Sequence, residues 1–274
     1  MVTYPAMLDV PRELIRFVAG LLRTERRAHG TRKGTRSLTC WKQALFAIAW
    51  FRDKPNITRH GAAFGLSQST AYRYLHETVD VLADRAPDLH QALDKAVTDG
   101  LPHLEMDGKI FASDRCRQKI VSVKDETIDA WFSGKTGGFG GQVQMLAEPD
   151  GFPIWFSDVL PGGVVDIEAA RALVLPALYP YATTMPVLAD PGYQGAGHGI
   201  IVPFKNPTGG NVLSIDNRCR NRLQRFLRCR GERGFALLTE RWTALKHTTL
   251  SPSRVGDIVR AAHVLTLFEY RRIS

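Results

Sequence analysis

The chain has 274 residues, of which 44% are hydrophobic and 23% charged, ordinary globular values that exclude wholesale disorder. This length can bury a core without disulfide or metal staples and suits one or two domains. The net charge of +9 indicates a polyanionic partner, nucleic acid before an anionic membrane surface. The four cysteines have no Cys-x-x-Cys spacing, which argues against a structural zinc site or a disulfide framework.

No segment of the sequence suits a membrane. Residues 172–189 carry no charge, but each of the prolines within them would cost a helix about 3 kcal/mol. Charged side chains also interrupt the first twenty residues, unlike the apolar core of a signal peptide. We therefore expect a cytoplasmic protein with no membrane partner.

Residues 1–36 are expected to form a basic N-terminal segment. Eight Lys and Arg side chains over 12–36 face only two acids, and eight more over 205–233 face only another two. Two separated basic clusters are typical of a protein that touches nucleic acid with two surfaces. Either cluster alone also fits a solvated helix face.

Residues 37–100 are predicted to form a helix-turn-helix DNA-binding domain. Over 58–75, Gly61 or Ala62 permits two helices to cross closely, Gly65 makes the turn and Ser67 caps the second helix. An ordinary corner between two helices fits the same pattern. In the DNA-binding interpretation, the second helix lies in the major groove and shows four side chains to base edges and phosphates. They are Gln68, Ser69, Thr70 and Arg73.

Residues 101–274 change to strands that alternate with helices, which predicts an α/β layered domain. Strands are expected over 104–111, 142–147, 152–156, 186–189 and 199–203, and helices over 166–175 and 215–246. Pro149 and Gly151 fit a tight turn between the second and third strands, which would make them an antiparallel hairpin.

Three acidic residues of this domain stand out by their surroundings. Asp107 lies within the first strand, Asp190 ends a short buried strand, and Glu232 lies in the long helix between two glycines. Each alone also fits a structural role, because strand-end Asp residues cap turns and helical Glu residues pair with Arg, here Arg228. Their significance therefore depends on the segments in which they lie.

Five segments, taken in order, resemble the bacterial DDE insertion-sequence transposases, the group similar to the eukaryotic Harbinger transposases. They are LEMDG (104–108), SGKTGGFGGQVQ (133–144), LPGGVVD (160–166), LADPGYQG (188–195) and GERGFALL (231–238). The resemblance implies an RNase H-like mixed sheet with flanking helices, preceded by an all-α helix-turn-helix domain. It also implies that Asp107, Asp190 and Glu232 are the catalytic acids and the ligands of Mg²⁺, for which Mn²⁺ can substitute.

The same resemblance implies a DNA transposase that binds terminal inverted repeats, cleaves the strands there and joins them to target DNA. Its partner is double-stranded DNA, at the element ends and at the target, and pairing two ends usually requires a homodimer or a larger assembly. Such a protein is expected to associate with the nucleoid. Three basic residues are candidates for contacting DNA phosphates. They are Lys135 in a Gly-rich loop, and Arg228 and Arg233 on the predicted helix of Glu232. Each of the three also fits a solvated positive face.

Two other functions stay open. One is a helix-turn-helix regulator whose second domain serves assembly, although a regulator has no need of acids at all three positions. The other is a nuclease or an inactive transposase remnant. Related enzymes often place Lys seven residues after the Glu, where it helps to hold DNA, and this chain has Thr239 there.

Overall fold

The computed structural model describes residues 8–121, 125–207, 209 and 212–273, without the side chain of Glu232. These residues divide into two compact units. The helical unit contains the described residues up to Ala86, then Leu238–His247 and the chain from Asp257 onward. The sheet unit contains Pro87–Leu237 and Thr248–Gly256. The C-terminal part of the chain, which the sequence analysis grouped with the α/β domain, thus packs largely with the N-terminal helices.

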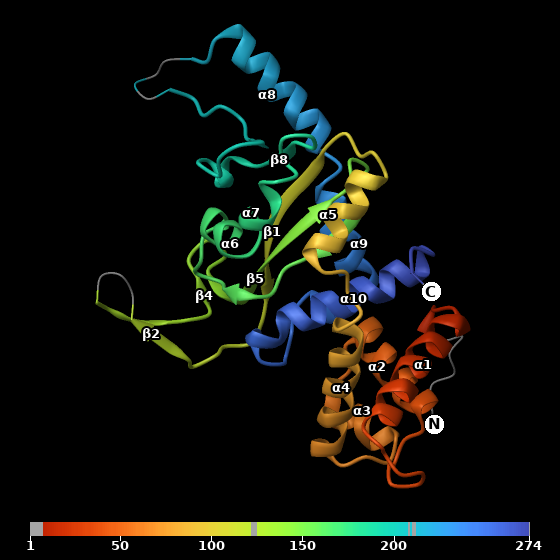
Figure 1. Cartoon of the computed structure of the whole chain (residues 1–274). Coiled ribbons are helices and arrows are strands. Elements are labelled where there is room, and N and C mark those ends of the chain that lie inside the picture. Colours follow the sequence, from red (N-terminus) through yellow and green to blue (C-terminus); the bar gives the residue numbers. More distant parts are fainter. Residues whose placement is uncertain (1–7, 122–124, 208, 210–211, 274) are drawn as a thin grey trace. The chain divides into compact units, whose positions relative to one another are not determined.

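The helical unit begins with α1 (Arg12–Ala28), α2 (Cys40–Asp53), α3 (Ile57–Ala63) and α4 (Gln68–Ala83) (Figure 1). Helix α1 lies in the basic segment and was not named by the sequence analysis. It forms because apolar residues spaced by three and four, among them Leu14, Val18 and Leu22, are buried on one face. Most of α10 (Val255–Glu269) joins this unit, with Phe268 stacked on Phe17 at 4.5 Å between ring centroids.

Helices α3 and α4 form the predicted helix-turn-helix. Gly65 adopts a φ of +71°, which a glycine tolerates at the turn. Ser67 caps α4, since its Oγ accepts a hydrogen bond from the Thr70 backbone N–H at 3.4 Å. The helices cross closely at Gly61, where a Cβ would lie 2.5 Å from the Cβ of Ala71. The turn, the cap and the close crossing therefore fall on the residues that the sequence indicated.

The sheet unit is built on β1 (Leu104–Ala112). Its antiparallel neighbour is β5 (Gly138–Ala147) and its parallel neighbour is β8 (Val187–Ala189). Strand β6 (Pro153–Phe156) pairs antiparallel with β5, which confirms the predicted hairpin, and β9 (Ile200–Ile201) pairs parallel with β8. The order β6-β5-β1-β8-β9 is that of the RNase H-like mixed sheet that was expected.

Shorter strands lie at the edges of this framework. They are β4 (Phe132–Ser133) and β7 (Leu160–Pro161), which pair with β5, and β2 (Lys119–Val121) with β3 (Thr127–Asp129), which form a separate hairpin.

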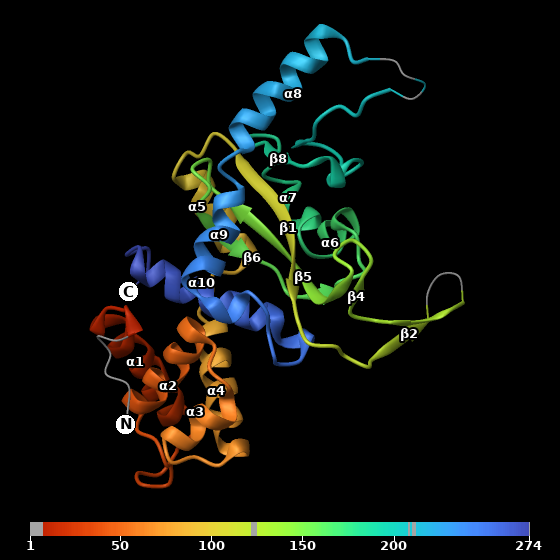
Figure 2. The same cartoon turned by 180° about the vertical axis from the view of Figure 1, so that it is seen from behind.

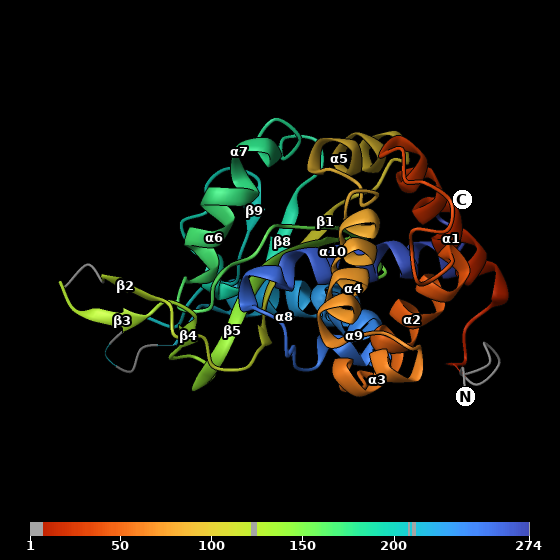
Figure 3. The same cartoon turned by 90° about the horizontal axis from the view of Figure 1, so that it is seen from below.

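Helices cover both faces of the sheet (Figures 2 and 3). On one face, α5 (Leu89–Thr98), α6 (Asp166–Leu173) and α7 (Leu175–Leu178) bury an apolar cluster that includes Leu104 and Met106 of β1. On the other face, α9 (Glu232–Arg241) sets Phe235 against Phe111 of β1, with ring centroids 5.9 Å apart. Because side chains alternate along a strand, β1 presents its odd-numbered residues to α9 and its even-numbered residues to α6 and α7.

Two helices end where the sequence did not predict. The single helix expected over 215–246 is wrong, because the chain forms α8 (Ile215–Arg228), α9 and the 3₁₀ turn η3 (Thr243–Leu245). The break comes at Gly231, where a Cβ would collide with a carboxylate oxygen of Glu105 on β1. The helix expected to reach Leu175 ends at Leu173, and Pro176 lies in the first turn of α7, where a missing N–H removes no helical hydrogen bond. No helix in the described part of the chain is long and apolar enough to cross a membrane.

The close crossing of α3 and α4 can be tested with paired Gly→Ala changes. Gly61→Ala should lower the free energy of unfolding by about 1–3 kcal/mol, because the added methyl group overlaps Ala71. Gly20→Ala is the matched control, since a Cβ at this helical position meets nothing within 4 Å and should stabilise the protein by roughly 0.5–1 kcal/mol. Urea unfolding followed by circular dichroism measures both. A Gly61→Ala protein as stable as the wild type would contradict the crossing.

Candidate active site

The parallel pairing of β1 with β8 brings two of the candidate acids together. Met106 lies opposite Ala189 in the register, so Asp107 and Asp190 follow at neighbouring positions. Asp190 directly follows β8 and caps the 3₁₀ turn η2 (Pro191–Tyr193), where its Oδ1 accepts a hydrogen bond from the Gly192 N–H at 2.7 Å. The Oδ1 of Asp107 accepts from the N–H of the next residue, Gly108, at 2.9 Å.

Negative charge accumulates around Asp107. Burial of this carboxyl group raises its pKa to about 6, and the charges of Asp190 and Asp166 act in the same direction. The Gly108 N–H and the charge of Arg228 oppose the rise without cancelling it. The protein therefore holds a partly buried carboxylate beside other acids, an arrangement that favours binding of a proton or a cation.

Asp166 is a further acid near Asp190, because a Cβ at Gly192 would lie within 3.2 Å of both carboxylates, and the sequence analysis did not select it. It is the first residue of α6, and its Oδ1 accepts a hydrogen bond from the Gln142 side chain at 2.5 Å. Its Oδ2 lies 3.1 Å from the Nζ of Lys135. A Cβ at Gly108 would approach the Asp166 Oδ1 to 2.7 Å, so the carboxylate lies directly against β1. The absence of a side chain at Gly108 is what admits it.

A buried polar layer supports Asp166 on this face of the sheet. Gln142 and Gln144 alternate along β5 and are at most 2% exposed. The Tyr193 hydroxyl donates to the Gln144 side-chain oxygen at 2.6 Å. Burial and the three neighbouring Asp charges raise the pKa of Tyr193, which keeps the phenol a neutral donor. Two glutamines spaced by two in an otherwise buried strand were the sequence signal for this layer.

Glu105 lies on the face of β1 that carries Asp107. It is 2% exposed, and neither carboxylate oxygen has a hydrogen-bond partner among the described residues. Burial raises its pKa to about 7, although Arg228 and Arg230 act in the opposite direction. Because Gly231 lies against this carboxylate, the backbone that enters α9 lies on the Asp107 face of the strand.

The third predicted acid, Glu232, is the first residue of α9, and its side chain lies outside the described part of the structure. The residue that precedes it, Gly231, lies against the Glu105 carboxylate. Farther along α9, Glu240 is exposed and Thr239 is only 9% exposed. The side chain of a lysine in place of Thr239 would have to extend from a buried position to reach solvent.

The predicted phosphate-contacting residues lie on different elements. Lys135 lies in the turn between β4 and β5, and its hydrogen bond to Asp166 raises the pKa of its ammonium group. Arg228 ends α8 and Arg233 lies on α9, so the two arginines do not share one long helix as expected. The sequence analysis also did not anticipate that Lys135 would reach the acids.

The helix-turn-helix presents its predicted side chains outward. Gln68, Ser69 and Arg73 are exposed on α4. Thr70 is only partly exposed, and its hydroxyl accepts from the Ser67 Oγ at 2.9 Å. Thr70 therefore contributes to the cap of α4, while Gln68, Ser69 and Arg73 expose their side chains on the surface of the helix.

The donor set at the acids is that of a hard cation. Asp107 and Asp190 carry carboxylate oxygens, which Mg²⁺ prefers over thiolate or imidazole ligands. No group of three or more His, Cys, Asp or Glu side chains that could hold a metal ion is found among the described residues, which do not include the side chain of Glu232. Burial raises the pKa of Asp107 and the charge of Asp190 adds to the rise, so a bound cation would stabilise the ionised carboxylate. The chemistry of the site thus fits a divalent cation.

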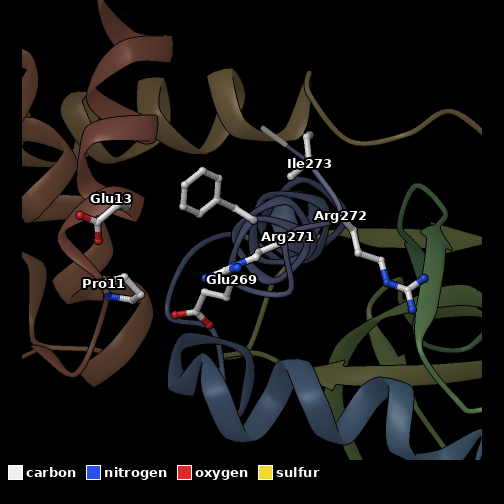
Figure 4. Close-up of a pocket in the computed structure, with 7 residues that line it drawn as sticks. Pro11, Glu13, Glu269, Arg271, Arg272 and Ile273 are labelled. Atoms are coloured by element: carbon white, nitrogen blue, oxygen red, sulfur yellow. The ribbon is translucent and has the colours of Figure 1, made fainter.

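The helical unit contains a separate hollow of about 580 Å³ (Figure 4). Pro11 and Glu13 line one side, and Glu269 and Arg271 line another. None of the acids of the sheet unit lines this hollow. It therefore adds no group to the chemistry described above.

Comparison with known protein families assigns both parts of the chain. A family model for a DDE superfamily endonuclease matches residues 106–266, more than half of the 274-residue chain. A second, for the helix-turn-helix of a DDE superfamily endonuclease, matches residues 36–88. No curated protein and no solved structure matches the chain. The two matches fall on the sheet with its acids and on the predicted helix-turn-helix.

The buried Glu105 should make stability depend on pH. Between its usual pKa of about 4.5 and its folded value of about 7, the folded protein binds more protons than the unfolded chain. The free energy of unfolding should therefore fall as the pH rises through this window, by up to about 3 kcal/mol. In EDTA, Glu105→Gln should be more stable than the wild type at pH 8 and should lose that advantage at pH 4.5.

Chemical denaturation at the two pH values measures this effect. Glu240→Gln is the matched control, because the exposed Glu240 side chain can change charge without a burial penalty. If Glu105→Gln has no advantage over the wild type at pH 8, the carboxylate is not destabilising the fold.

Proposed function

The chain belongs to the DDE superfamily endonucleases and carries their helix-turn-helix, and from this premise we propose that it is an insertion-sequence transposase. It binds the terminal inverted repeats with its helix-turn-helix, cleaves the DNA strands there and transfers them to target DNA. The observation that carries the proposal is the pairing of β1 with β8, which sets Asp107 and Asp190 side by side. Their mutual repulsion supports a site made for cations.

Endonucleases of this superfamily use divalent metal ions, and we propose Mg²⁺ here, with Mn²⁺ as a substitute. When bound, such ions activate the attacking oxygen and stabilise the leaving one. Asp107, Asp190 and Glu232 are proposed to hold them. Asp107 and Asp190 are oriented by backbone N–H groups of Gly108 and Gly192, which fixes their carboxylates before any ligand arrives.

The remaining groups handle the DNA phosphates. Lys135 is proposed to contact the phosphate beside the acids, because its ammonium is already held there by Asp166. Arg228 and Arg233 extend the positive surface at the α8–α9 junction. The buried Thr239 leaves α9 without the lysine that related enzymes often use, so the contact that lysine makes must come from other bases. Lys135 is proposed to make this contact, because its ammonium group already pairs with Asp166.

Base recognition is proposed to lie on α4. Gln68, Ser69 and Arg73 project from its first two turns, while Thr70 secures the cap. Two copies of the chain, at least, are required to hold two element ends together. A homodimer or a larger assembly is therefore proposed for the reaction.

The enzyme can be separated from a DNA-binding regulator by removing one charge. Glu232→Gln should preserve DNA binding, or strengthen it, because a repulsive charge near phosphate is lost. Cleavage should fall by orders of magnitude, since electrostatic stabilisation supplies most of the barrier reduction. Asp107→Asn and Asp190→Asn should behave alike, and double changes should cost little more than single ones.

The assay uses a supercoiled plasmid that carries the gene with its flanking DNA, with Mg²⁺, alongside a gel shift on the same DNA. Glu240→Gln, a change of the same kind on the exposed face of α9, is the control and should cut normally. Equal cutting by the wild type and Glu232→Gln would remove Glu232 from the catalytic set. A wild-type protein that binds but never cuts with any divalent metal would support the regulator or the inactive remnant.

Sequence reading by α4 makes a separate prediction. Arg73→Ala should reduce discrimination between element-end DNA and random DNA by about 1–3 kcal/mol if its guanidinium contacts a base in two places. Titrations of both DNAs over a range of salt concentrations measure the effect, because phosphate contacts alone change the salt slope. Equal losses on the two DNAs would assign Arg73 to the phosphates instead.

A further inference from the structure

A groove in the sheet unit lies beside Asp190 and has no assigned role. It measures about 410 Å³, within the range of small-ligand sites, and lies between α8 and the segment that follows β9. Its lining begins at Pro191, the residue directly after Asp190. Gln224 fixes α8 over this region, since its side-chain amide donates to the Ala189 carbonyl at 3.2 Å and to the Ile201 carbonyl at 2.6 Å.

The wall of the groove contains an aromatic ring that is fixed yet exposed. The Asn221 side chain accepts from the Phe204 N–H at 2.9 Å and donates to the Phe204 carbonyl at 2.8 Å. The guanidinium of Arg220 lies 4.8 Å from the centre of the Phe204 ring. Even so, Phe204 remains 41% exposed. The Asn221 hydrogen bonds fix the backbone of Phe204 and Arg220 lies over one face of the ring, while part of the ring stays exposed and can stack on a base.

The other wall of the groove is positively charged. Arg225 and Arg228 line it. Both belong to α8, which carries five arginines and a single acid, Asp216. A flat aromatic surface beside arginines matches the two parts of a nucleotide, because bases stack on aromatic rings while guanidinium groups contact phosphates.

We propose that this groove binds an unpaired DNA nucleotide next to the strand that the acids cut, with its base on Phe204 and its phosphates on Arg225 and Arg228. The inference rests on the proposed function, because it assigns a part of the DNA substrate to the same site. A strand that enters an active site from a duplex end must leave its partner, and a pocket for one unstacked base lowers the cost of that separation. The position of Pro191 places the pocket one residue from the second acid.

The test compares two fluorescent duplexes of identical sequence, one blunt and one with a four-nucleotide single-stranded overhang. Fluorescence anisotropy with the full chain in EDTA, at fixed salt, gives the dissociation constants without cleavage. The wild type should bind the overhang duplex about five- to tenfold more tightly, the size of one base–aromatic stack. Phe204→Ala should lose this preference while its affinity for the blunt duplex stays within about twofold, and Phe204→Trp should keep the preference.

Phe226→Ala is the matched control. Phe226 lies on α8 and is 72% exposed, but it does not line the groove, so its removal should leave the overhang preference intact. If the wild type binds both duplexes equally, or if Phe204→Ala keeps the preference, the nucleotide pocket is wrong and the proposed transposase is unaffected. If the wild type binds neither duplex, the proposed function fails and the pocket fails with it.

Discussion

The alignment of two parallel strands is the constraint on which the site depends. Pairing of β1 with β8 puts Asp107 next to Asp190, and α6 then adds Asp166 against the bare backbone of Gly108. Like charges at this spacing oppose folding unless protons or cations neutralise them. A buried polar layer offsets part of this repulsion. The Gln142 amide donates a hydrogen bond to Asp166, and the Tyr193 hydroxyl donates one to the neighbouring Gln144. The fold thus holds a charge arrangement that is unfavourable on its own.

Much of this framework could be predicted from the sequence. Strand alternation and turn residues located β1 and the β5–β6 hairpin, and the spacing of Gly61, Gly65 and Ser67 located the helix-turn-helix. These features depend on local chemistry, namely side-chain period, turn conformation and capping. The carboxyl end of β8 was also predictable, because a short apolar run stops abruptly at Asp190.

Features that depend on contacts between distant residues were not predictable in this way. At the break before α9, Gly231 lies against Glu105, more than a hundred residues earlier, and this contact leaves no room for a side chain. Asp166, the first residue of the helix predicted over 166–175, contacts Gln142 of β5 and Lys135 of the β4–β5 turn. Neither contact leaves a periodic pattern in the sequence, because each joins one residue to one distant partner.

The route of the chain limits how its parts can be rearranged. The helical unit is assembled from three separate stretches, and its C-terminal stretches place Trp242 against Phe51 and Phe268 against Phe17. A fragment cut after the helix-turn-helix would lack Trp242 and Phe268, which would leave Phe51 and Phe17 without these aromatic partners. The core around the helix-turn-helix therefore depends on segments from both the N-terminal and the C-terminal part of the chain. Exchange of the helix-turn-helix between relatives by simple fusion would disrupt these contacts, whereas substitution of exposed residues on α4 would not.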